Sequence, residues 1–545
     1  MKKTLMAITV SAVAMGSLSA NVAVASESVQ SHKYEVRNVI LMIGDGMGPQ
    51  QVGLLEEYVR RAPGSELERQ TALSKLANKG RLGLSLNAPH GKHGKLVVDS
   101  ACSATQLATG VAAGSEMIGL DYQGNVVETI LEKAKKAGKA TGLVSDTRIT
   151  HATPAAFASH QPHRSFESQI AVELIESGNV DVMLSGGARV FMPSDIKKDV
   201  ADQEVMAALG APKSVYKKSK RKDDRNLVVE AKEKHGYELA FDRKQLESAA
   251  TDKLLGLFAN SGMNDGIAYS TCKKNNSCTQ PSLRDMTIKA LDVLSRDEDG
   301  FFLMVEGGQI DWAGHANDAG WMLHELLKFD EAVNAVYEWV ENRNDTLVVV
   351  TADHETGSFG FSYSRKETPK AETLPGAGMK GHDYKPNFNF GDLAHLDRLY
   401  NQSGTFFDML DAASPDWNFD EASAKDWQAA INKYSDYKVT IDQAAAVGER
   451  EKNSYYQTGH KYQSAKVVPQ FDDFKEFYVY ADDDHTAKIG RVLAADQNVV
   501  WGTGTHTAAP VPVYAFGPTS VTEQFSTMQH HVEVGQKMIK ALGLK

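Results

Sequence analysis

The sequence predicts an α/β fold with a doubly wound, mostly parallel central sheet and helices on both faces. Short apolar runs typical of buried parallel strands alternate with amphipathic segments at helical spacing. Acidic and histidine side chains follow the ends of several of these runs, which is where open α/β sheets place ligands. The chain of 545 residues, 42% of them hydrophobic, is long enough to bury a large core.

The expected strands and helices follow in order along the chain. Six apolar runs are the expected strands: 39–43, 140–144, 180–184, 301–305, 346–350 and 511–516. Four amphipathic segments are expected to cover the sheet: 126–136, 165–177, 283–295 and 322–341.

Two stretches interrupt this alternation. Residues 361–500 are long, aromatic and rich in Asp and Asn, and we expect a large insertion within a single domain that spans 26–545. Residues 213–225 are dense in Lys and Arg. Such a run is typical of a solvated helix or loop, and a phosphate-attracting patch is the alternative.

Residues 1–25 have the pattern of a secretory signal peptide. Lys2 and Lys3 precede an apolar run at 5–18, and small residues end in Ala23-Val24-Ala25. The run is too short to span a bilayer, and no later stretch approaches the roughly 20 apolar residues that a span needs. We therefore expect a periplasmic or secreted protein without a membrane partner, and a retained N-terminal anchor is the alternative.

The net charge and the cysteines further restrict the expected partners and the cellular compartment. The 59 Lys and Arg residues against 70 Asp and Glu give a net charge of −11. This balance argues against broad nucleic-acid binding, so no nucleic-acid partner is expected and any attraction for an anion must be local. Cys272 and Cys278 are close in sequence, which predicts a disulfide in an oxidising compartment, with two free thiols as the alternative. Cys102 is expected to be a small packing residue.

Ser100 is the strongest candidate nucleophile. It follows Asp99 and precedes small residues that can begin a helix, whose N-terminal N–H groups would face an anion. No histidine flanks Ser100 in the sequence, so activation of its hydroxyl by a metal is the simplest explanation. Asp99 could hold a phosphate-binding arginine in place.

Side chains of metal-binding type recur in blocks far apart in the sequence. Asp311 with His315, and Asp353 with His354, combine carboxylate with imidazole, a combination that zinc favours over magnesium. Asp45, Thr153 and Glu306 offer oxygen ligands instead, which suit a harder ion such as Mg²⁺ with some of its waters.

Six blocks together resemble the alkaline phosphatase family in order and approximate spacing: 43–48, 99–101, 151–156, 305–311 with His315, 351–354 and 504–507. The resemblance covers most of the chain and fails mainly across 361–500 and 213–225. It implies an enzyme that hydrolyses small phosphate monoesters to an alcohol and inorganic phosphate through a covalent phosphoserine.

The same resemblance implies a role for each candidate residue. Ser100 would be the nucleophile and Arg164 the phosphate clamp. One zinc would be held by Asp311, His315 and His506, and a second by Asp45, Asp353 and His354. A magnesium ion would take Asp45, Thr153 and Glu306.

Two positions depart from the best-known bacterial members of the family. Those members look to have Asp at the position of His151 and Lys at the position of Trp312, and both changes resemble the Vibrio-type, marine-bacterial branch. Trp312 brings no charge to the phosphate, which predicts weaker binding of the phosphate product than in a Trp312→Lys variant. His151 near the third metal could let that site accept zinc. The long insertion resembles the enlarged loops of this branch and implies a homodimer.

Three other functions compete with this interpretation. The Gly-Asp-Gly-Met-Gly segment at 44–48 lacks the spacing of a dinucleotide-binding loop. A phosphodiesterase or sulfatase would share the metal scaffold, but Asp99-Ser100 with Arg164 favours monoesters. An exported zinc-binding protein would need the histidines but neither Ser100 nor Arg164, and replacing Ser100 with Ala separates it from an enzyme.

Overall fold

A ten-stranded, mostly parallel sheet lies at the centre of the computed structural model, which describes residues 36–91 and 94–545. The strand order is β16-β2-β15-β8-β1-β7-β3-β4-β6-β5, and β15 runs antiparallel to both of its neighbours. The strands are β1 (Asn38–Gly44), β2 (Arg81–Leu86), β3 (Ala140–Arg148), β4 (Val182–Gly186), β5 (Glu238–Ala240), β6 (Leu254–Leu257), β7 (Phe301–Gly307), β8 (Thr346–Thr351), β15 (Val511–Phe516) and β16 (Met528–His530). The predicted fold class is confirmed, whereas the expected signal peptide lies outside the described residues.

All six predicted strands are present, and β4 begins two residues later than expected. The four strands that the sequence did not predict lie toward the two edges of the sheet. Strand β2 alternates buried and exposed residues, and β5 and β16 have only three residues each. Central parallel strands are covered on both faces and read as apolar runs, whereas edge strands do not.

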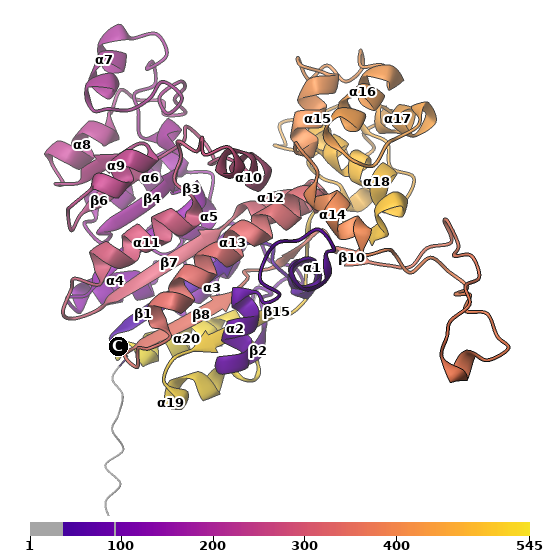
Figure 1. The fold of residues 1–545 in the computed structure, drawn as a ribbon. Coiled ribbons are helices and arrows are strands. Elements are labelled where there is room, and N and C mark those ends of the chain that lie inside the picture. The colour runs from indigo at the N-terminus through magenta and orange to yellow at the C-terminus, as the bar shows by residue number, and fades with distance from the viewer. Residues whose placement is uncertain (1–35, 92–93) are drawn as a thin grey trace, which may run out of the picture. The chain divides into compact units, whose positions relative to one another are not determined.

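Alternate side chains of the central strands enter two separate cores. From β1, Ile40 and Met42 pack in one hydrophobic cluster, and Leu41 and Ile43 pack in the other. Helices α1, α2, α11 and α13 contribute to the first cluster, and α3, α4, α6 and α20 to the second, so helices cover both faces of the sheet (Figure 1). The period of two along each strand produces this division.

Capping residues set where the covering helices begin. The segment expected at 126–136 starts only at Ile130, because Thr129 and Glu132 form a capping box. Asp318 caps the next long helix by accepting a hydrogen bond from the N–H of Trp321 at 3.0 Å. The helices of this part are α1 (Pro49–Arg61), α2 (Ala72–Lys79), α3 (Ser100–Thr109), α4 (Ile130–Lys136), α5 (Ala152–Ala155), α6 (Glu167–Glu176), α7 (Val200–Ala208), α8 (Leu227–Glu233), α9 (Arg243–Ser248), α10 (Gly266–Lys274), α11 (Leu283–Leu294), α12 (Gln309–His315), α13 (Ala319–Val340), α19 (Thr519–Thr522) and α20 (His531–Ala541).

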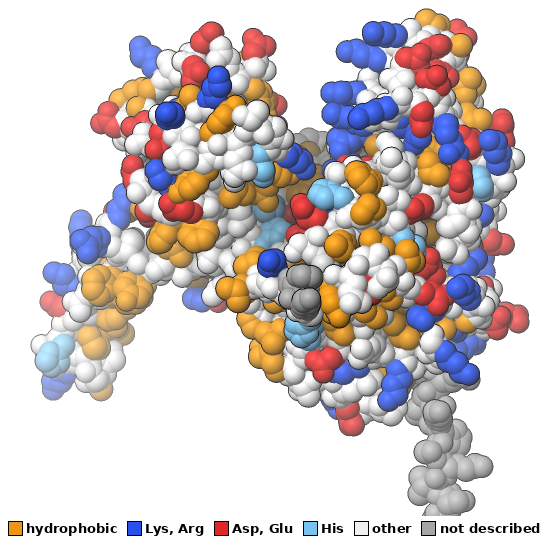
Figure 2. Space-filling model, turned by 180° about the vertical axis from the view of Figure 1, so that it is seen from behind, with side chains coloured by type: hydrophobic (Ala, Val, Ile, Leu, Met, Phe, Trp, Pro, Cys, Tyr) orange, Lys and Arg blue, Asp and Glu red, His pale blue; other side chains and the backbone are white. Residues whose placement is uncertain are grey.

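The expected insertion consists of an extended arm, residues 362–393, and a helical block. The block holds α14 (Ala394–Tyr400), α15 (Phe406–Ala413), α16 (Ala424–Tyr434), α17 (Ile441–Val447) and α18 (His485–Gln497). The carboxylate of Asp318 accepts hydrogen bonds from Gln402 Nε2 at 2.7 Å and from the N–H of Phe406 at 2.8 Å, and so ties the block to α13. The arm extends away from the sheet and carries exposed hydrophobic side chains (Figures 1 and 2).

Six short strands pair outside the main sheet: β9 (Glu355–Thr356) with β14 (His506–Thr507), β10 (Gly360–Phe361) with β13 (Val499–Val500), and β11 (Arg450–Lys452) with β12 (Val467–Pro469). The antiparallel pair of β9 and β14 matters most, because it sets His506 opposite Thr356, two residues after His354. Among the described residues, no helix is both long and apolar enough to cross a bilayer.

Candidate active site

The candidate residues converge at the carboxyl ends of the central parallel strands. Asp45 follows β1, which pairs with β7 on one side and β8 on the other, and the register places Ile43 opposite both Glu306 and Thr351. Asp353 comes two residues after the end of β8. Side chains that are hundreds of residues apart in sequence therefore meet at one edge of the sheet.

Ser100 is the first residue of α3, with Asp99 as the N-cap. One carboxylate oxygen of Asp99 accepts from the N–H of Ala101 at 3.0 Å, and the other accepts from the N–H of Glu116 at 2.8 Å. These bonds fix the start of the helix, whose N-terminus favours an anion. Ser100 is 1% exposed, and its hydroxyl lies 3.1 Å from His354 Nε2.

Asp311, His315 and His506 form a first group of converging ligand atoms. The two Nε2 atoms lie 3.2 Å apart, and Asp311 Oδ1 lies 3.3 Å from His315 Nε2 and 3.5 Å from His506 Nε2. The Nδ1 atoms face the carbonyl oxygens of Gly504 at 2.7 Å and Val98 at 2.9 Å, so in the neutral rings the proton belongs on Nδ1. Two Nε2 lone pairs and a carboxylate then face one another, which a cation would stabilise.

Asp45, Asp353 and His354 form a second group, completely buried. His354 Nε2 lies 3.1 Å from Asp353 Oδ2 and 3.6 Å from Asp45 Oδ1. Neither oxygen of Asp45 has a hydrogen-bond partner among the described residues, and the same holds for Asp353 Oδ2. Buried carboxylate oxygens without partners are rare in proteins, and a bound divalent cation accounts for them.

Around Asp45 and Glu306 lies a third set of donors, which includes His151. Thr153 Oγ1 and Glu306 Oε1 are buried and lack hydrogen-bond partners among the described residues. Thr147 donates to Glu306 Oε2 at 3.1 Å, and Ser145 donates to the same oxygen. These bonds occupy Oε2 and leave Oε1 as the carboxylate oxygen of Glu306 that is free to bind an ion.

The electrostatics of the buried carboxylates are those of a site built for cations. Burial, reinforced by Asp353, raises the pKa of Asp45 well above its usual value. Burial also raises the pKa of Glu306 to about 7 and that of Asp353 to about 6. Bound divalent cations would reverse these shifts, because they favour the ionised form of each carboxyl group. The residues present therefore fit divalent metal ions at the predicted positions.

Arg164 reaches the same site from the loop before α6. Its Nη1 lies 3.4 Å from Asp99 Oδ2 and its Nη2 lies 3.3 Å from His151 Nε2. The predicted contact between Asp99 and this arginine is thus confirmed. Asp99 caps the helix that begins at Ser100 and also orients the Arg164 guanidinium group. The Ser100 hydroxyl and the guanidinium group are therefore held in a fixed position relative to each other.

Aromatic residues border the site, and sequence reasoning found only one of them. The ring of Trp312 meets that of His151 edge to face, with centroids 6.0 Å apart. Tyr480 packs edge to face on His315, with centroids 5.0 Å apart. Tyr480 comes from the insertion, where no motif marks it. His531 was also missed, although its Nε2 lies 2.9 Å from the carbonyl oxygen of Asp353 and helps to position that loop.

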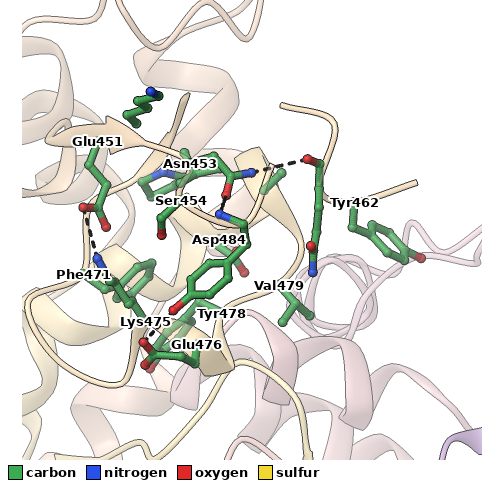
Figure 3. A pocket seen from close by; sticks show the side chains of 16 residues that line it. Glu451, Asn453, Ser454, Tyr462, Phe471, Lys475, Glu476, Tyr478, Val479 and Asp484 are labelled. Carbon is green, nitrogen blue, oxygen red and sulfur yellow. Dashed lines mark hydrogen bonds and ion pairs between the residues drawn. The ribbon is translucent and has the colours of Figure 1, made fainter. Parts of the chain in front are cut away.

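A cavity of about 110 Å³ lies within the insertion, next to the segment that carries Tyr480 (Figure 3). Its lining includes Tyr455, Phe471 and Tyr478, together with Glu476 and Lys475. Two of these lining residues are joined by a hydrogen bond, which Tyr455 donates to Glu476 Oε1 at 2.7 Å. None of the predicted catalytic or metal-binding residues lines the cavity, so it lies outside the active site.

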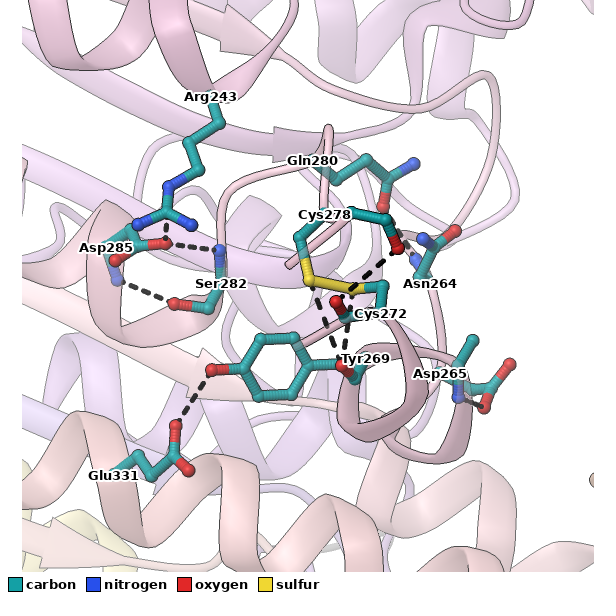
Figure 4. Close-up of a disulfide and its surroundings, with 12 residues drawn as sticks. Arg243, Asn264, Asp265, Tyr269, Cys272, Cys278, Gln280, Ser282, Asp285 and Glu331 are labelled. Carbon is teal, nitrogen blue, oxygen red and sulfur yellow. Dashed lines mark hydrogen bonds and ion pairs between the residues drawn. A yellow bond between two sulfur atoms is a disulfide. The ribbon is translucent and has the colours of Figure 1, made fainter. Parts of the chain in front are cut away.

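The predicted disulfide between Cys272 and Cys278 is present at the end of α10 (Figure 4). Tyr269, on the same helix, donates to Glu331 Oε2 on α13 at 2.9 Å. The disulfide thus closes the turn that follows α10 beside a contact with the core helix. Cys102 is free and fully buried, as expected of a packing residue.

Comparison with known proteins agrees with this geometry. The sequence model of the family described as Alkaline phosphatase matches residues 36–544. The chain is 31% identical to Alkaline phosphatase 3 of Bacillus subtilis, over 99% of this chain and 97% of that protein. It is 33% identical to Alkaline phosphatase of Escherichia coli, over 59% of this chain and 70% of that protein.

A solved structure of the cold-active alkaline phosphatase from a psychrophilic Shewanella sp. is also similar. It aligns with a TM-score of 0.63 at 25% identity and covers 93% of this chain and 99% of its own. The chain therefore belongs to the alkaline phosphatase family and is an enzyme that uses divalent metals to hydrolyse phosphate monoesters.

Proposed function

We propose that the enzyme acts through two displacements at phosphorus, with a covalent phosphoserine at Ser100 between them. The observation that carries this proposal is the position of the Ser100 hydroxyl. It lies at the N-terminus of α3 and 3.1 Å from His354 Nε2, where the buried carboxylates of the second group also converge. His354 is a poor general base for Ser100, because burial lowers its pKa well below the usual value.

The chain's own groups would carry the substrate through both steps. The Ser100 oxygen forms a bond to phosphorus as the bond to the leaving alcohol oxygen breaks, and a water oxygen later displaces Ser100. Two inversions retain the configuration at phosphorus. The Arg164 guanidinium can bind two phosphoryl oxygens at once, and the N–H groups at the start of α3 add further donors.

We assign two zinc ions and one magnesium ion to the three groups of ligands. One zinc would be held by Asp311, His315 and His506, the second by Asp45, Asp353 and His354, and magnesium by Asp45, Thr153 and Glu306. When bound, these ions would neutralise the phosphoryl charge and lower the pKa of the hydroxyl and water nucleophiles.

The hydrogen bonding of His151 favours magnesium over zinc in the third group. Arg164 can only donate, so His151 Nε2, which faces it at 3.3 Å, must accept, and the proton of the neutral ring belongs on Nδ1. Nδ1 is buried and has no partner among the described residues. A buried ring N–H without an acceptor suits a contact with a water held by magnesium better than direct coordination of zinc through that nitrogen.

The test compares Ser100→Ala with Ser103→Ala, a matched change three residues further along α3. We expect Ser100→Ala to lower kcat for p-nitrophenyl phosphate at alkaline pH by roughly a thousandfold or more, with its zinc content unchanged by metal analysis. Ser103→Ala should keep most of the activity. Full activity in Ser100→Ala would refute the phosphoserine, and turnover of bis-p-nitrophenyl phosphate but not of the monoester would favour a diesterase.

Localisation and assembly complete the proposal. The pattern at 1–25 and the Cys272–Cys278 disulfide support a periplasmic or secreted protein, because disulfides persist in oxidising compartments. We also propose a homodimer in which the arm, residues 362–393, contacts the partner subunit. Tyr363, Phe388 and Phe390 cluster on the arm and are 58%, 43% and 65% exposed, an arrangement that a second subunit would bury.

A further inference from the structure

Five exposed lysines lie on the loop between α7 and α8: Lys213, Lys217, Lys218, Lys220 and Lys222. None of them forms an ion pair with another described residue. Residues 213–225 contain seven Lys or Arg and only two Asp, although the whole chain carries a net charge of −11. The loop is therefore a local positive surface on an acidic protein, and we call these five residues the lysine row.

Buried polar side chains hold the loop in one conformation. Arg221 is 5% exposed and donates to the carbonyl oxygens of Val190 at 3.1 Å and Ser168 at 3.2 Å. Asn260 is 7% exposed and donates to the carbonyl oxygen of Lys218 at 2.7 Å. Because these bonds hold the backbone of the loop, an anion that binds the exposed lysines would not have to order the loop.

Short contacts connect the lysine row to the active site. The N–H of Lys220 donates to the carbonyl oxygen of Arg189 at 2.7 Å, and Arg189 Nη1 donates to Ser261 Oγ at 3.0 Å. The next residue, Gly262, lies against Trp312, since a Cβ at Gly262 would be 2.7 Å from the Trp312 ring. Three contacts and one peptide bond thus lead from Lys220 to the tryptophan beside Asp311.

Further positive charge lies between the lysine row and the phosphate clamp. Arg189 and Arg148 share one carboxylate, that of Glu167, at 3.3 Å and 2.9 Å. Arg148 ends β3 and comes three residues before His151, which contacts Arg164. Figure 2 shows Lys and Arg side chains gathered beside the hollow at the centre of the view. Because two guanidinium groups share one carboxylate, the region between Lys220 and Arg164 carries excess positive charge.

We propose that the lysine row binds the distal negative charges of polyanionic phosphate monoesters whose terminal phosphate occupies the active site. This inference rests on the proposed function and adds a class of preferred substrates, esters that carry further phosphate groups along a chain. Attraction is local, because salt screens charges beyond about 10 Å at 0.1 M, so the acidic remainder of the protein does not cancel it. Each contact between lysine and phosphate would release counterions and make binding salt-dependent.

The test compares Lys217→Gln/Lys218→Gln/Lys220→Gln with a control that removes three exposed, unpaired lysines elsewhere, Lys274→Gln/Lys425→Gln/Lys540→Gln. The substrates are p-nitrophenyl phosphate and a 5′-phosphorylated thymidylate 12-mer. At 50 mM salt, we expect the first variant to lose about tenfold in kcat/KM for the 12-mer, on the order expected for three phosphate contacts. It should keep wild-type kcat/KM for p-nitrophenyl phosphate, and the control should match the wild type on both substrates.

A binding measurement separates this inference from the proposed function. Fluorescence anisotropy of a labelled 12-mer in the Ser100→Ala background measures affinity at several salt concentrations without turnover. We expect the lysine-row variant to bind more weakly, with a shallower salt dependence. Equal affinity and equal salt dependence for the lysine-row variant and the control would overturn the inference. If the wild type hydrolysed neither substrate, the proposed function would fail, and the affinities would still decide the role of the lysine row.

Discussion

At the scale of single residues, the site depends on which atoms of each polar side chain already form hydrogen bonds to the backbone. His315 and His506 use Nδ1 to donate to backbone oxygens, which leaves Nε2 of each ring free to bind a metal. Asp99 uses both carboxylate oxygens on backbone N–H groups and still contacts Arg164. These three side chains are therefore each oriented by a second contact, and substitution of those contacts should disturb the site as substitution of the ligands would.

Trp312 is the residue whose effect on phosphate can be tested most directly. Its ring contacts His151 and offers no charge, so we expect Trp312→Lys to bind the phosphate product more tightly. The inhibition constant for phosphate should fall about tenfold, as for one charge-assisted hydrogen bond of roughly 1.5 kcal/mol. Competitive inhibition of p-nitrophenyl phosphate hydrolysis measures it, with Trp312→Phe as the neutral control. An unchanged constant in the lysine variant would contradict the prediction.

At the scale of elements, buried polar side chains join the helices. His324 on α13 lies 2.8 Å from Ser270 Oγ on α10 through Nδ1 and 2.9 Å from the carbonyl oxygen of Tyr400 on α14 through Nε2. Burial lowers the pKa of His324 to about 4. The ring stays neutral in the folded protein at pH values where it is already protonated in the unfolded chain.

The lowered pKa of His324 predicts that the folded protein loses stability in acid. Because the pKa of His324 is lower in the folded protein than its unfolded value of about 6.5, stability falls as the pH drops from about 6.5 to 4, by roughly 3 kcal/mol in total. His324→Gln should unfold at lower urea concentration than the wild type at pH 7, yet lose less further stability at pH 4.5. His382→Gln, a change on the exposed arm, serves as the control. An equally steep decline in all three proteins would disprove the assignment.

At the scale of the whole molecule, the arm is the part best suited to assembly. Ser364 and Asn389 form reciprocal backbone hydrogen bonds at 2.8 and 2.9 Å, so the two ends of the segment between them lie side by side. The segment can therefore be replaced by a short turn without opening the rest of the fold. In a monomer, the aromatic side chains of the arm would stay exposed to water.

Shortening the arm tests the proposed homodimer. We expect the full-length protein to have twice the mass of one chain by light scattering at working concentration. A variant with residues 366–387 replaced by a Gly-Ser turn, and with Tyr363, Phe388 and Phe390 changed to Ser, should have the mass of a single chain and retain its disulfide, which lies in another part of the fold. A monomeric wild type, or a shortened variant that still dimerises, would rule out this interface.

The sequence predicted the central sheet because its parallel strands are buried on both faces and therefore read as apolar runs. It did not predict β2, where buried and exposed residues alternate, or the three-residue strands β5 and β16. The same reasoning found Asp45, Glu306 and Asp353, because each lies at or just beyond the end of a buried strand. Tyr480 was missed, since its contact with His315 depends on how the insertion folds back on the site.

The sequence by itself determined the fold class, the candidate nucleophile and the kinds of metal ligand, because local periodicity and residue chemistry carry that information. Only the tertiary structure decided which ligands meet, which nitrogen of each histidine remains free, and that the basic run connects to the active site through Arg189. Those properties depend on contacts between residues far apart in the chain. A net charge of −11 could not reveal a fixed positive loop beside the site, because charge acts locally in salt solution.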